Sequence, residues 1–334
     1  MNILIVNDWK EYSGAEIIIN ILLEEYKNLG HNPKLLVKPL FHEFVREVKT
    51  FKPDIIDFHN IILTDITPIL YCKKYKIPFV QSLHDYWLVC RFRHYYLVNQ
   101  NRICDNKILD APICNSCLSI LFKFPSPSKL YDIYKDVTLV VPSCKMKTVL
   151  SNFGYKEENI KVIYHGIPEY NANIEDQGYV LVVASKMPWK GREIAENLSK
   201  ELKDIPFKIV GVQSGKIDKI DPGYISREEL YDLYRKSSLV FNPTRWEEPC
   251  GLVNLEAMMF HKVVLGLKVG ALPEYIQNFT FNSLEELKDK LIDLMNNKED
   301  RTRYGEENYK NYKERFTSRR MALEYINLME EIRC

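Results

Sequence analysis

The sequence lacks the features that mark several classes of protein. No apolar run is long enough to span a bilayer, and no secretory signal precedes the first strand pattern, Asn2–Val6. Positive and negative charges nearly cancel, and the net charge of +1 argues against nucleic acid as the main partner. The first predicted strand runs into NDWKEYSGAE without a Gly-x-Gly-x-x-Gly motif, which disfavours a nicotinamide-dependent dehydrogenase. These absences predict a globular, cytoplasmic protein.

Strand and helix patterns alternate along most of the chain. Its 334 residues suit two domains of ordinary size. In the N-terminal half, buried strand patterns occur at 2–6, 34–37, 55–58, 79–83, 138–141 and 160–164, separated by helical patterns. Gly166–Gly178 loses the apolar period and reads as a linker, after which a second series starts at Tyr179 and ends in three helices. The sequence therefore predicts an α/β protein with two doubly wound parallel sheets.

Phe241–Phe260, FNPTRWEEPCGLVNLEAMMF, predicts a strand, a charged turn and a helix, with Glu248 before the helix and Glu256 inside it. In a parallel sheet such a helix begins at the carboxyl edge of the strands, where ligands bind. Free backbone N–H groups at the helix start would favour a phosphate there, and they belong to Cys250, Gly251 and Leu252. Taken alone, the two glutamates favour a structural interpretation over a functional one. Glu248 would complement the helix dipole, and Glu256 would be a solvated helix residue.

Other motifs strengthen the functional interpretation. EPCGLVNLEAM is followed by VGALPEYI at Val269–Ile276 and preceded by PGYISREELYDLY at Pro222–Tyr234. The N-terminal half contains SGAE at Ser13–Glu16 and LHDYW at Leu83–Trp87. In this order the motifs resemble the retaining glycosyltransferases of family 4, which have the GT-B fold of two Rossmann-like domains facing a cleft.

The resemblance implies a domain organisation and a reaction. Residues 1–168 would bind the acceptor and residues 169–315 the nucleotide sugar, while the helix in 316–334 would pack back on the N-terminal domain. The reaction would move a sugar from a nucleoside-diphosphate sugar to a hydroxyl of a glycan or lipid-linked acceptor. It would retain the anomeric configuration without a catalytic metal, and the leaving phosphate would accept the proton.

The resemblance also implies roles for single residues. Glu256 would accept hydrogen bonds from the ribose, Glu248 would face the donor sugar, and the N–H groups of residues 250–252 would receive the distal phosphate. Lys190 would supply positive charge to the diphosphate. The remaining donor-binding positions on this interpretation are Gly14, which lets the backbone approach the phosphate, Tyr224 beside the nucleobase, and Lys186.

Lys186 enters because the sequence departs from the family pattern. The family usually has an arginine five residues before the phosphate-binding lysine, where this chain has Ser185, and Lys186 lacks the planar fork of arginine. A second departure is His261-Lys262, where glycine is more usual. His84 ends an apolar strand at the ligand edge and would contact the donor sugar or lie near the acceptor, and His59-Asn60 follows a strand at the same edge.

Four of the eight cysteines crowd residues 88–121, namely Cys90, Cys104, Cys114 and Cys117. The last two form C-x2-C, so the four could make a structural zinc site, with disulfides and free thiols as the alternatives. Leu118–Tyr134 mixes aromatics and lysines, and membrane contact on the inner face of the cell membrane competes with core packing as its explanation.

Two other functions remain open at this stage. A sugar-nucleotide epimerase could use the same fold, and a nucleotide-sugar-binding protein without turnover would fit the missing arginine. The sequence does not identify the donor sugar, the base, the acceptor or the oligomeric state.

Overall fold

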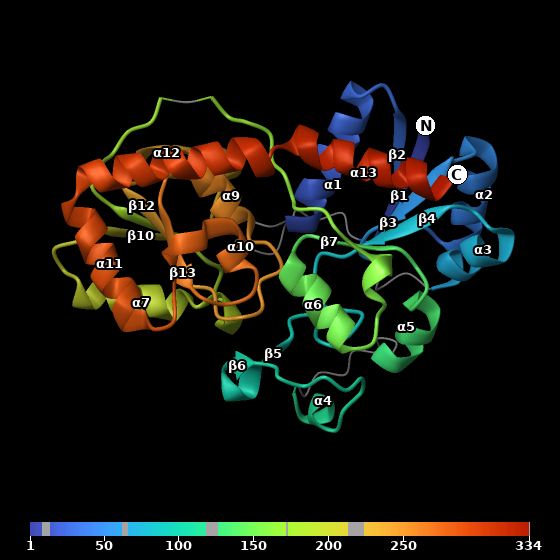
Figure 1. The fold of residues 1–334 in the computed structure, drawn as a ribbon, viewed down its shortest axis with the longest axis horizontal. Helices are drawn as coiled ribbons and strands as arrows, with labels where there is room; N and C mark the ends of the chain where they lie inside the picture. The colour runs from blue at the N-terminus through green and yellow to red at the C-terminus, as the bar shows by residue number, and fades with distance from the viewer. Residues whose placement is uncertain (9–13, 62–65, 118–125, 172, 213–223, 334) are drawn as a thin grey trace. The chain divides into compact units, whose positions relative to one another are not determined.

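The computed structural model describes residues 1–8, 14–61, 66–117, 126–171, 173–212 and 224–333, and these form two compact units (Figure 1). The first unit comprises Met1–Tyr95, Asp105–His165 and Ser318–Cys334. The second comprises Tyr96–Cys104 and Gly166–Thr317. Apart from the short segment Tyr96–Cys104, the chain thus passes into the second unit at Gly166, and it returns to the first for its last helix.

The first unit contains a six-stranded sheet in the order β2-β1-β3-β4-β7-β8, and each neighbouring pair is parallel. Its strands are β1 (Asn2–Asn7), β2 (Asn32–Val37), β3 (Ile55–Phe58), β4 (Phe79–Ser82), β7 (Leu139–Val141) and β8 (Ile160–Val162). Its helices are α1 (Gly14–Asn28), α2 (Phe41–Phe51), α3 (Thr67–Tyr75), α4 (Ile113–Ser116), α5 (Pro127–Tyr134), α6 (Cys144–Asn152) and α13 (Ser318–Arg333). Parallel neighbours require crossover connections, and the intervening helices provide them.

The second unit repeats this plan in the order β11-β10-β9-β12-β13-β14, again with parallel neighbours. Its strands are β9 (Val180–Val183), β10 (Phe207–Val212), β11 (Tyr224–Ile225), β12 (Leu239–Asn242), β13 (Val264–Leu267) and β14 (Thr280–Phe281). Its helices are α7 (Arg192–Glu201), α8 (Arg227–Lys236), α9 (Leu252–Met259), α10 (Leu272–Ile276), α11 (Leu284–Asn296) and α12 (Lys298–Arg315). The predicted fold class is confirmed: both units are doubly wound parallel α/β structures.

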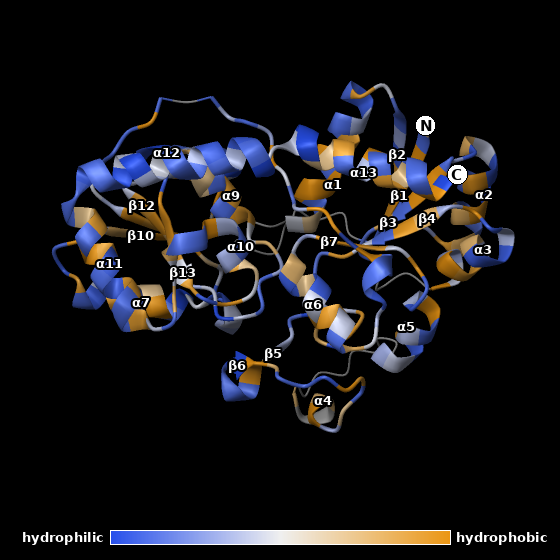
Figure 2. Cartoon of the chain, viewed as in Figure 1, coloured by the Kyte–Doolittle hydropathy of each residue, from blue (hydrophilic) through white to orange (hydrophobic). Residues whose placement is uncertain are grey.

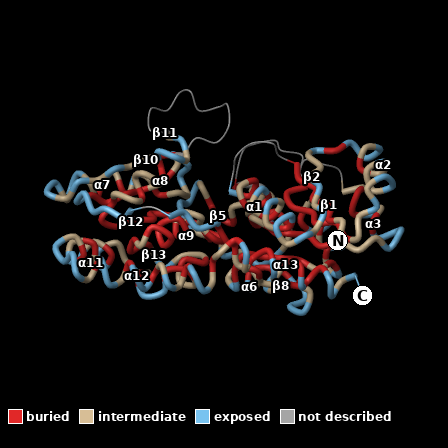
Figure 3. The backbone as a smooth tube through the Cα atoms, turned by 90° about the horizontal axis from the view of Figure 1, so that it is seen from above, coloured by how far each residue is buried: buried red, intermediate tan, exposed pale blue. Residues whose placement is uncertain are grey.

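Burial explains why the sheets were visible in the sequence. The central strands are mostly hydrophobic (Figure 2) and buried (Figure 3), as is typical of parallel strands with helices on both faces. In the second unit, Val180, Val182 and Leu239 are fully buried in a core that also receives Leu287 and Leu291 of α11. The apolar runs at these positions therefore form the core, whereas the polar residues at the strand ends are available for a functional site.

The last helix packs in the first unit. Helix α13 contacts α1, and its Ser318 hydroxyl is hydrogen-bonded to Glu25 near the end of that helix. Tyr325, also on α13, is buried and lies 3.2 Å from the Ser82 hydroxyl at the end of β4. Helix α13 therefore contributes a polar group to the centre of the first sheet.

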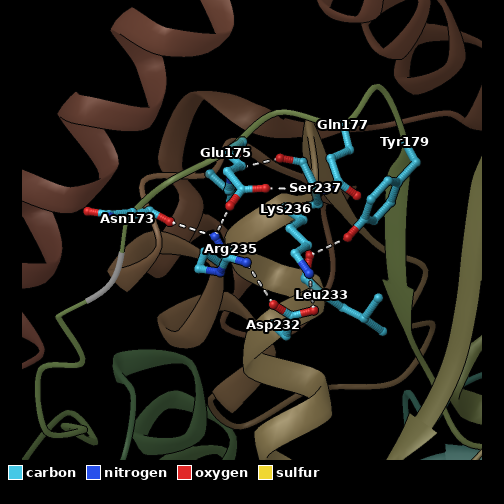
Figure 4. A network of polar contacts seen from close by, with 10 residues as sticks. Asn173, Glu175, Gln177, Tyr179, Asp232, Leu233, Arg235, Lys236 and Ser237 are labelled. Atoms are coloured by element: carbon cyan, nitrogen blue, oxygen red, sulfur yellow. Dashed lines mark hydrogen bonds and ion pairs between the residues drawn. The ribbon is translucent and has the colours of Figure 1, made fainter.

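The second half of the linker is tied to the second unit (Figure 4). The backbone N–H of Glu175 donates to the Arg235 carbonyl at 3.0 Å, and that of Gln177 donates to the Lys236 carbonyl at 2.9 Å. The buried Lys262 ammonium donates to the carbonyls of Glu175 and Ser237 at 2.8 and 2.7 Å, and burial lowers its pKa to about 8. The unusual Lys262 thus fastens the linker to the end of α8.

The four-cysteine zinc site expected at residues 88–121 is not formed by the residues that the structure describes, which include Cys90, Cys104, Cys114 and Cys117. Among them, no three His, Cys, Asp or Glu side chains are placed to hold a metal ion.

This segment takes its order from other contacts. The Arg91 guanidinium donates to Asp110 at 2.8 Å, and the Tyr95 hydroxyl donates to the Asn106 carbonyl at 2.6 Å. A short antiparallel pair, β5 (Tyr96–Leu97) with β6 (Arg102–Ile103), adds backbone hydrogen bonds. Polar pairing and a hairpin therefore order the part of this segment that the structure describes.

The stretch expected to meet a membrane or the core is described only in part, because residues 118–125 lie outside the described residues. In the described part, α5 buries Leu130 and Tyr134. Core packing therefore explains these two residues. No helix among the described residues is long and apolar enough to cross a bilayer.

Candidate active site

The turn that holds Glu248 is built by a close fit between two loops of the second unit. Gly270 has a φ of +53°, and a Cβ there would lie 2.3 Å from the backbone nitrogen of Glu248. The N–H of the next residue, Ala271, donates to the Glu248 carbonyl at 2.9 Å. Only glycine allows this approach, so the VGALPEYI loop fixes the backbone of the EPCG turn.

Three donors converge on one carboxylate oxygen of Glu248. Its Oε2 accepts from Lys190 Nζ at 2.7 Å, from Trp246 Nε1 at 2.7 Å and from Thr244 Oγ1 at 3.4 Å. The Lys190 ammonium also lies 4.9 Å from the centre of the Trp246 ring. These three contacts orient the carboxylate through Oε2.

Lys190 is held beside Glu248 by the turn that opens α7. Residues Pro188–Lys190 form one 3-10 turn that ends at Gly191, whose φ is +67°. The Arg245 N–H donates to the Trp189 carbonyl at 2.9 Å, which joins this turn to the loop after β12. The two loops that carry the lysine and the glutamate are therefore hydrogen-bonded to each other.

Gly191 is the tightest point of this junction, because an added Cβ would lie 2.0 Å from the Pro243 carbonyl oxygen. We expect Gly191→Ala to lower the free energy of unfolding by about 2 to 4 kcal/mol, the sum of backbone strain and overpacking. Gly178→Ala is the matched control, since φ is +76° there and nothing lies within 4 Å. It should cost only about 1 kcal/mol. Denaturant unfolding of both variants checks this, and equal losses would contradict the proposed junction.

Glu256 lies on α9 in a second polar cluster. It is buried, and its carboxylate pairs with the Arg227 guanidinium at the start of α8. The buried Tyr234, whose hydroxyl donates to the Val253 carbonyl at 3.4 Å, lies close to this carboxylate. Burial raises the pKa of Glu256 above its usual range, and Arg227 opposes that rise. Because Glu248 and Glu256 are 7% and 3% exposed, neither is a solvated surface residue.

The start of α9 lies between the two glutamates. Gly251 caps the helix with a φ of +81°, and its carbonyl accepts from the Asn254 N–H at 2.9 Å. The Asn254 side chain accepts from Asn242 Nδ2 at 2.9 Å, which ties the helix to the end of β12. The buried Cys250 precedes this turn. The N–H groups expected to meet a phosphate are thus at a helix N-terminus at the carboxyl end of β12.

The other predicted donor residues lie at varied places. Lys186 is exposed in the loop after β9, and Tyr224 begins β11, where it pairs with Gly211. Gly14 is exposed at the first residue of α1, in the first unit, and Ser13 lies outside the described residues. The structure thus brings together Glu248 and Lys190, and it adds Arg227 and Trp246, which sequence reasoning missed.

Two histidines of the first unit are adjacent. His59 follows β3, His84 follows β4, and their rings stack with centres 5.1 Å apart. The ring of His165 lies 5.2 Å from that of His84. Asp85 accepts from the Arg93 guanidinium and from the Trp87 N–H, so its carboxylate orders the loop after His84.

The residues around both glutamates lie in one segment that is similar to a known family. Residues 167–311 match the family model for glycosyl transferases group 1. This match covers nearly all of the second unit and includes Lys190, Arg227, Glu248 and Glu256. Over this part the chain is therefore similar to glycosyl transferases group 1.

Curated relatives agree with this match. The chain is 29% identical over 202 residues to an uncharacterized glycosyltransferase of Methanocaldococcus jannaschii, which covers 53% of this chain and 56% of the relative. It is 26% identical over 215 residues to a probable sucrose-phosphate synthase of Thermosipho melanesiensis, which covers 63% of this chain and 47% of the relative. The chain thus spans about half the length of these relatives.

Solved structures give the fold of the whole chain. The Anabaena protein HepE in complex with UDP-glucose superposes with a TM-score of 0.69 at 14% identity, and the match covers 99% of this chain and 100% of HepE. This likeness confirms the GT-B fold.

Proposed function

We propose that this protein is a retaining, metal-independent glycosyltransferase. It moves a sugar from a nucleoside-diphosphate sugar to a hydroxyl of a glycan or lipid-linked acceptor. The observation that carries the proposal is the pairing of Lys190 with Glu248 on one side of the α9 N-terminus and of Arg227 with Glu256 on the other. The family match over the same segment and the UDP-glucose bound by HepE support a nucleotide-sugar donor.

In this proposal the site acts by stabilising the charges that develop on the diphosphate and on the donor sugar. The N–H groups of residues 250–252 and the Lys190 ammonium bind the diphosphate, so they stabilise the negative charge that develops on the leaving group. Glu256 accepts hydrogen bonds from the ribose. Glu248, oriented through Oε2 by three donors, presents Oε1 to the donor sugar near the developing positive charge.

The proton of the acceptor hydroxyl moves to the leaving diphosphate. As the C–O bond to the diphosphate breaks, a phosphate oxygen gains negative charge and takes the proton of the attacking acceptor hydroxyl. Attack from the face that the diphosphate leaves preserves the anomeric configuration. No protein nucleophile and no metal ion are needed, and the first unit binds the acceptor.

A thermal-shift screen tests the proposal and narrows the donor. Nucleoside-diphosphate sugars that differ in base and sugar are added at about a hundred times their Kd, where a specific ligand adds about 2.7 kcal/mol of stability. We expect at least one to stabilise the protein equally with and without EDTA. Stabilisation by none of them, or only with a divalent metal, would overturn the proposal.

We also propose that the protein works at the inner face of the cell membrane and that α2 and α3 touch the bilayer. Leu40, Phe41, Leu70 and Tyr75 are 40 to 62% exposed there. Tyr71 joins Phe41 and Tyr75 through ring contacts of 5.9 and 4.5 Å. Three exposed lysines lie in or beside α3, which suits an anionic surface, and they are Lys73, Lys74 and Lys76.

Vesicle flotation checks the membrane proposal. The protein should float with vesicles that contain anionic lipid, and Leu40→Glu with Tyr75→Glu should abolish this. Leu323→Glu is the matched control, because Leu323 is 41% exposed on α13. Flotation that survives the double change, or that Leu323→Glu also abolishes, would contradict a role for α2 and α3.

A further inference from the structure

A chain of buried polar groups crosses the centre of the first unit and ends at His84. Asp57 lies on β3, Ser82 on β4, and His59 immediately after β3. All three are 0% exposed. Asp57 and His59 are two residues apart, so their side chains leave the sheet on the same face. Polar groups in such a place require partners, because an unpaired buried group costs free energy.

The partners are found within the chain itself. Asp57 Oδ1 accepts from the Ser82 hydroxyl at 2.7 Å, and the Tyr325 hydroxyl of α13 lies 3.2 Å from that of Ser82. Asp57 Oδ2 lies 3.1 Å from His59 Nε2 in a buried ion-pair contact that does not meet hydrogen-bond geometry, and among the described residues neither atom has a hydrogen-bond partner. His59 Nδ1 lies 2.8 Å from His84 Nε2. His84 Nδ1 is buried and has no partner in the described part of the chain.

The chemistry of these groups allows one direction of hydrogen bonding when both imidazoles are neutral. A carboxylate oxygen 3.1 Å away repels a nitrogen lone pair and attracts an N–H, so His59 Nε2 carries the proton. A neutral imidazole has one donor and one acceptor, so His59 Nδ1 accepts, and His84 Nε2 must donate to it. The Nδ1 atom of His84 is then left without a proton, and its lone pair is not used by the other groups of this polar network.

We infer that Asp57 and His59 are positioning residues that fix the tautomer of His84, so that His84 Nδ1 accepts a hydrogen bond from a sugar hydroxyl. The inference rests on the proposed function for the identity of that hydroxyl. The tautomer of His84, in contrast, is argued from contacts within the first unit alone and does not depend on the proposed function.

The surroundings keep His84 neutral. Burial lowers the pKa of His84 well below its usual value, and the neighbouring His59, His165 and Arg93 add to this. Burial also lowers the pKa of His165 to about 3, so it remains uncharged at neutral pH. On the other side of the chain, burial and the Asp57 charge raise the pKa values of Tyr26 and Tyr325, which remain protonated. A neutral acceptor at Nδ1 suits a hydroxyl better than an anion.

Imidazole ¹⁵N NMR at neutral pH tests the tautomer without any substrate. In the wild-type protein we expect the His84 proton on Nε2, and His84→Gln assigns the signal. Asp57→Asn should move the proton to Nδ1, because the Asn amide can donate to His59 Nε2 and reverse every bond in the chain. A wild-type His84 proton on Nδ1, or no change in Asp57→Asn, would overturn the inference. The wild-type spectrum decides even if the variant does not fold.

Kinetics separate this inference from the proposed function. Asp57→Asn should lower kcat by about 100-fold or more, as a wrong tautomer does in a catalytic triad. The Kd for the nucleoside diphosphate should stay within about two-fold, because the phosphate contacts proposed for Lys190 and residues 250–252 are in the second unit. A reversed tautomer with unchanged kcat would refute the role in turnover. Absence of transfer by the wild type would refute the proposed function while leaving the tautomer result intact.

Discussion

Replacing Glu256 by glutamine is expected to raise the donor Kd by about 30-fold or more, equivalent to about 2 kcal/mol. The change removes the carboxylate that is to accept the ribose hydroxyls. It also leaves the Arg227 guanidinium, 35% exposed in the folded protein, without its anionic partner. Since the ionised carboxylate of Glu256 accepts stronger hydrogen bonds than the protonated acid, affinity should also fall on acidification. Because the pKa of Glu256 is raised, this fall should begin above the pH expected for an ordinary glutamate.

Calorimetric titration of the nucleotide sugar against both proteins measures the effect. Glu228→Gln is the matched control, because Glu228 is an exposed residue of α8 next to Arg227. It should bind the donor with wild-type affinity. If Glu256→Gln also binds normally, Glu256 is a structural partner of Arg227 and does not contact the ribose.

Glu248→Gln is expected to act on the chemical step, with a loss in kcat of about 10²- to 10³-fold. The amide keeps the shape of the side chain, so nucleotide affinity should change only a few-fold, but it removes the negative charge that faces the donor sugar. Lys190→Ala should lower both affinity and kcat. Because Lys190 Nζ and Glu248 Oε2 are 2.7 Å apart, the two changes should not be additive, with a coupling energy of about 0.5 to 3 kcal/mol.

Steady-state kinetics of the single and double variants provide this measurement. Glu193→Gln serves as the control, because Glu193 pairs with Arg245 in a more exposed ion pair of the same unit. Exposed pairs contribute little, so kcat should remain near the wild-type value. Additive effects of the Glu248 and Lys190 changes would show that the pair does not act as a unit.

The sheets were predictable because their strands are buried on both faces. The strand Ile55–Phe58, for example, was predicted with the bounds that the structure gives it. The pair β5 and β6 was missed, since strands of two residues are too short to show any period. The zinc site was predicted from C-x2-C spacing, which reports distance along the chain and not the positions of the four side chains in space.

The site residues were predictable only where a short stretch of sequence determines the local backbone conformation. The turn EPCG and the helix start after it follow from glycine and strand-to-helix patterning, and Glu248 and Glu256 were found there. Arg227 was missed because it meets Glu256 across 29 positions, and neither residue alone signals that contact. Asp57 was interpreted as part of an apolar strand. Its buried charge within IIDF was a signal that sequence reasoning could have used, because such a group requires partners.

The anomer first released from the donor tests the central claim most directly. A donor identified by thermal shift is incubated with the protein, and ¹H NMR follows the sugar that slow hydrolysis frees before it mutarotates. From an α-linked donor, we predict that the α anomer appears first and that Glu248→Gln slows its release by at least about 100-fold. The β anomer appearing first would contradict a retaining transferase.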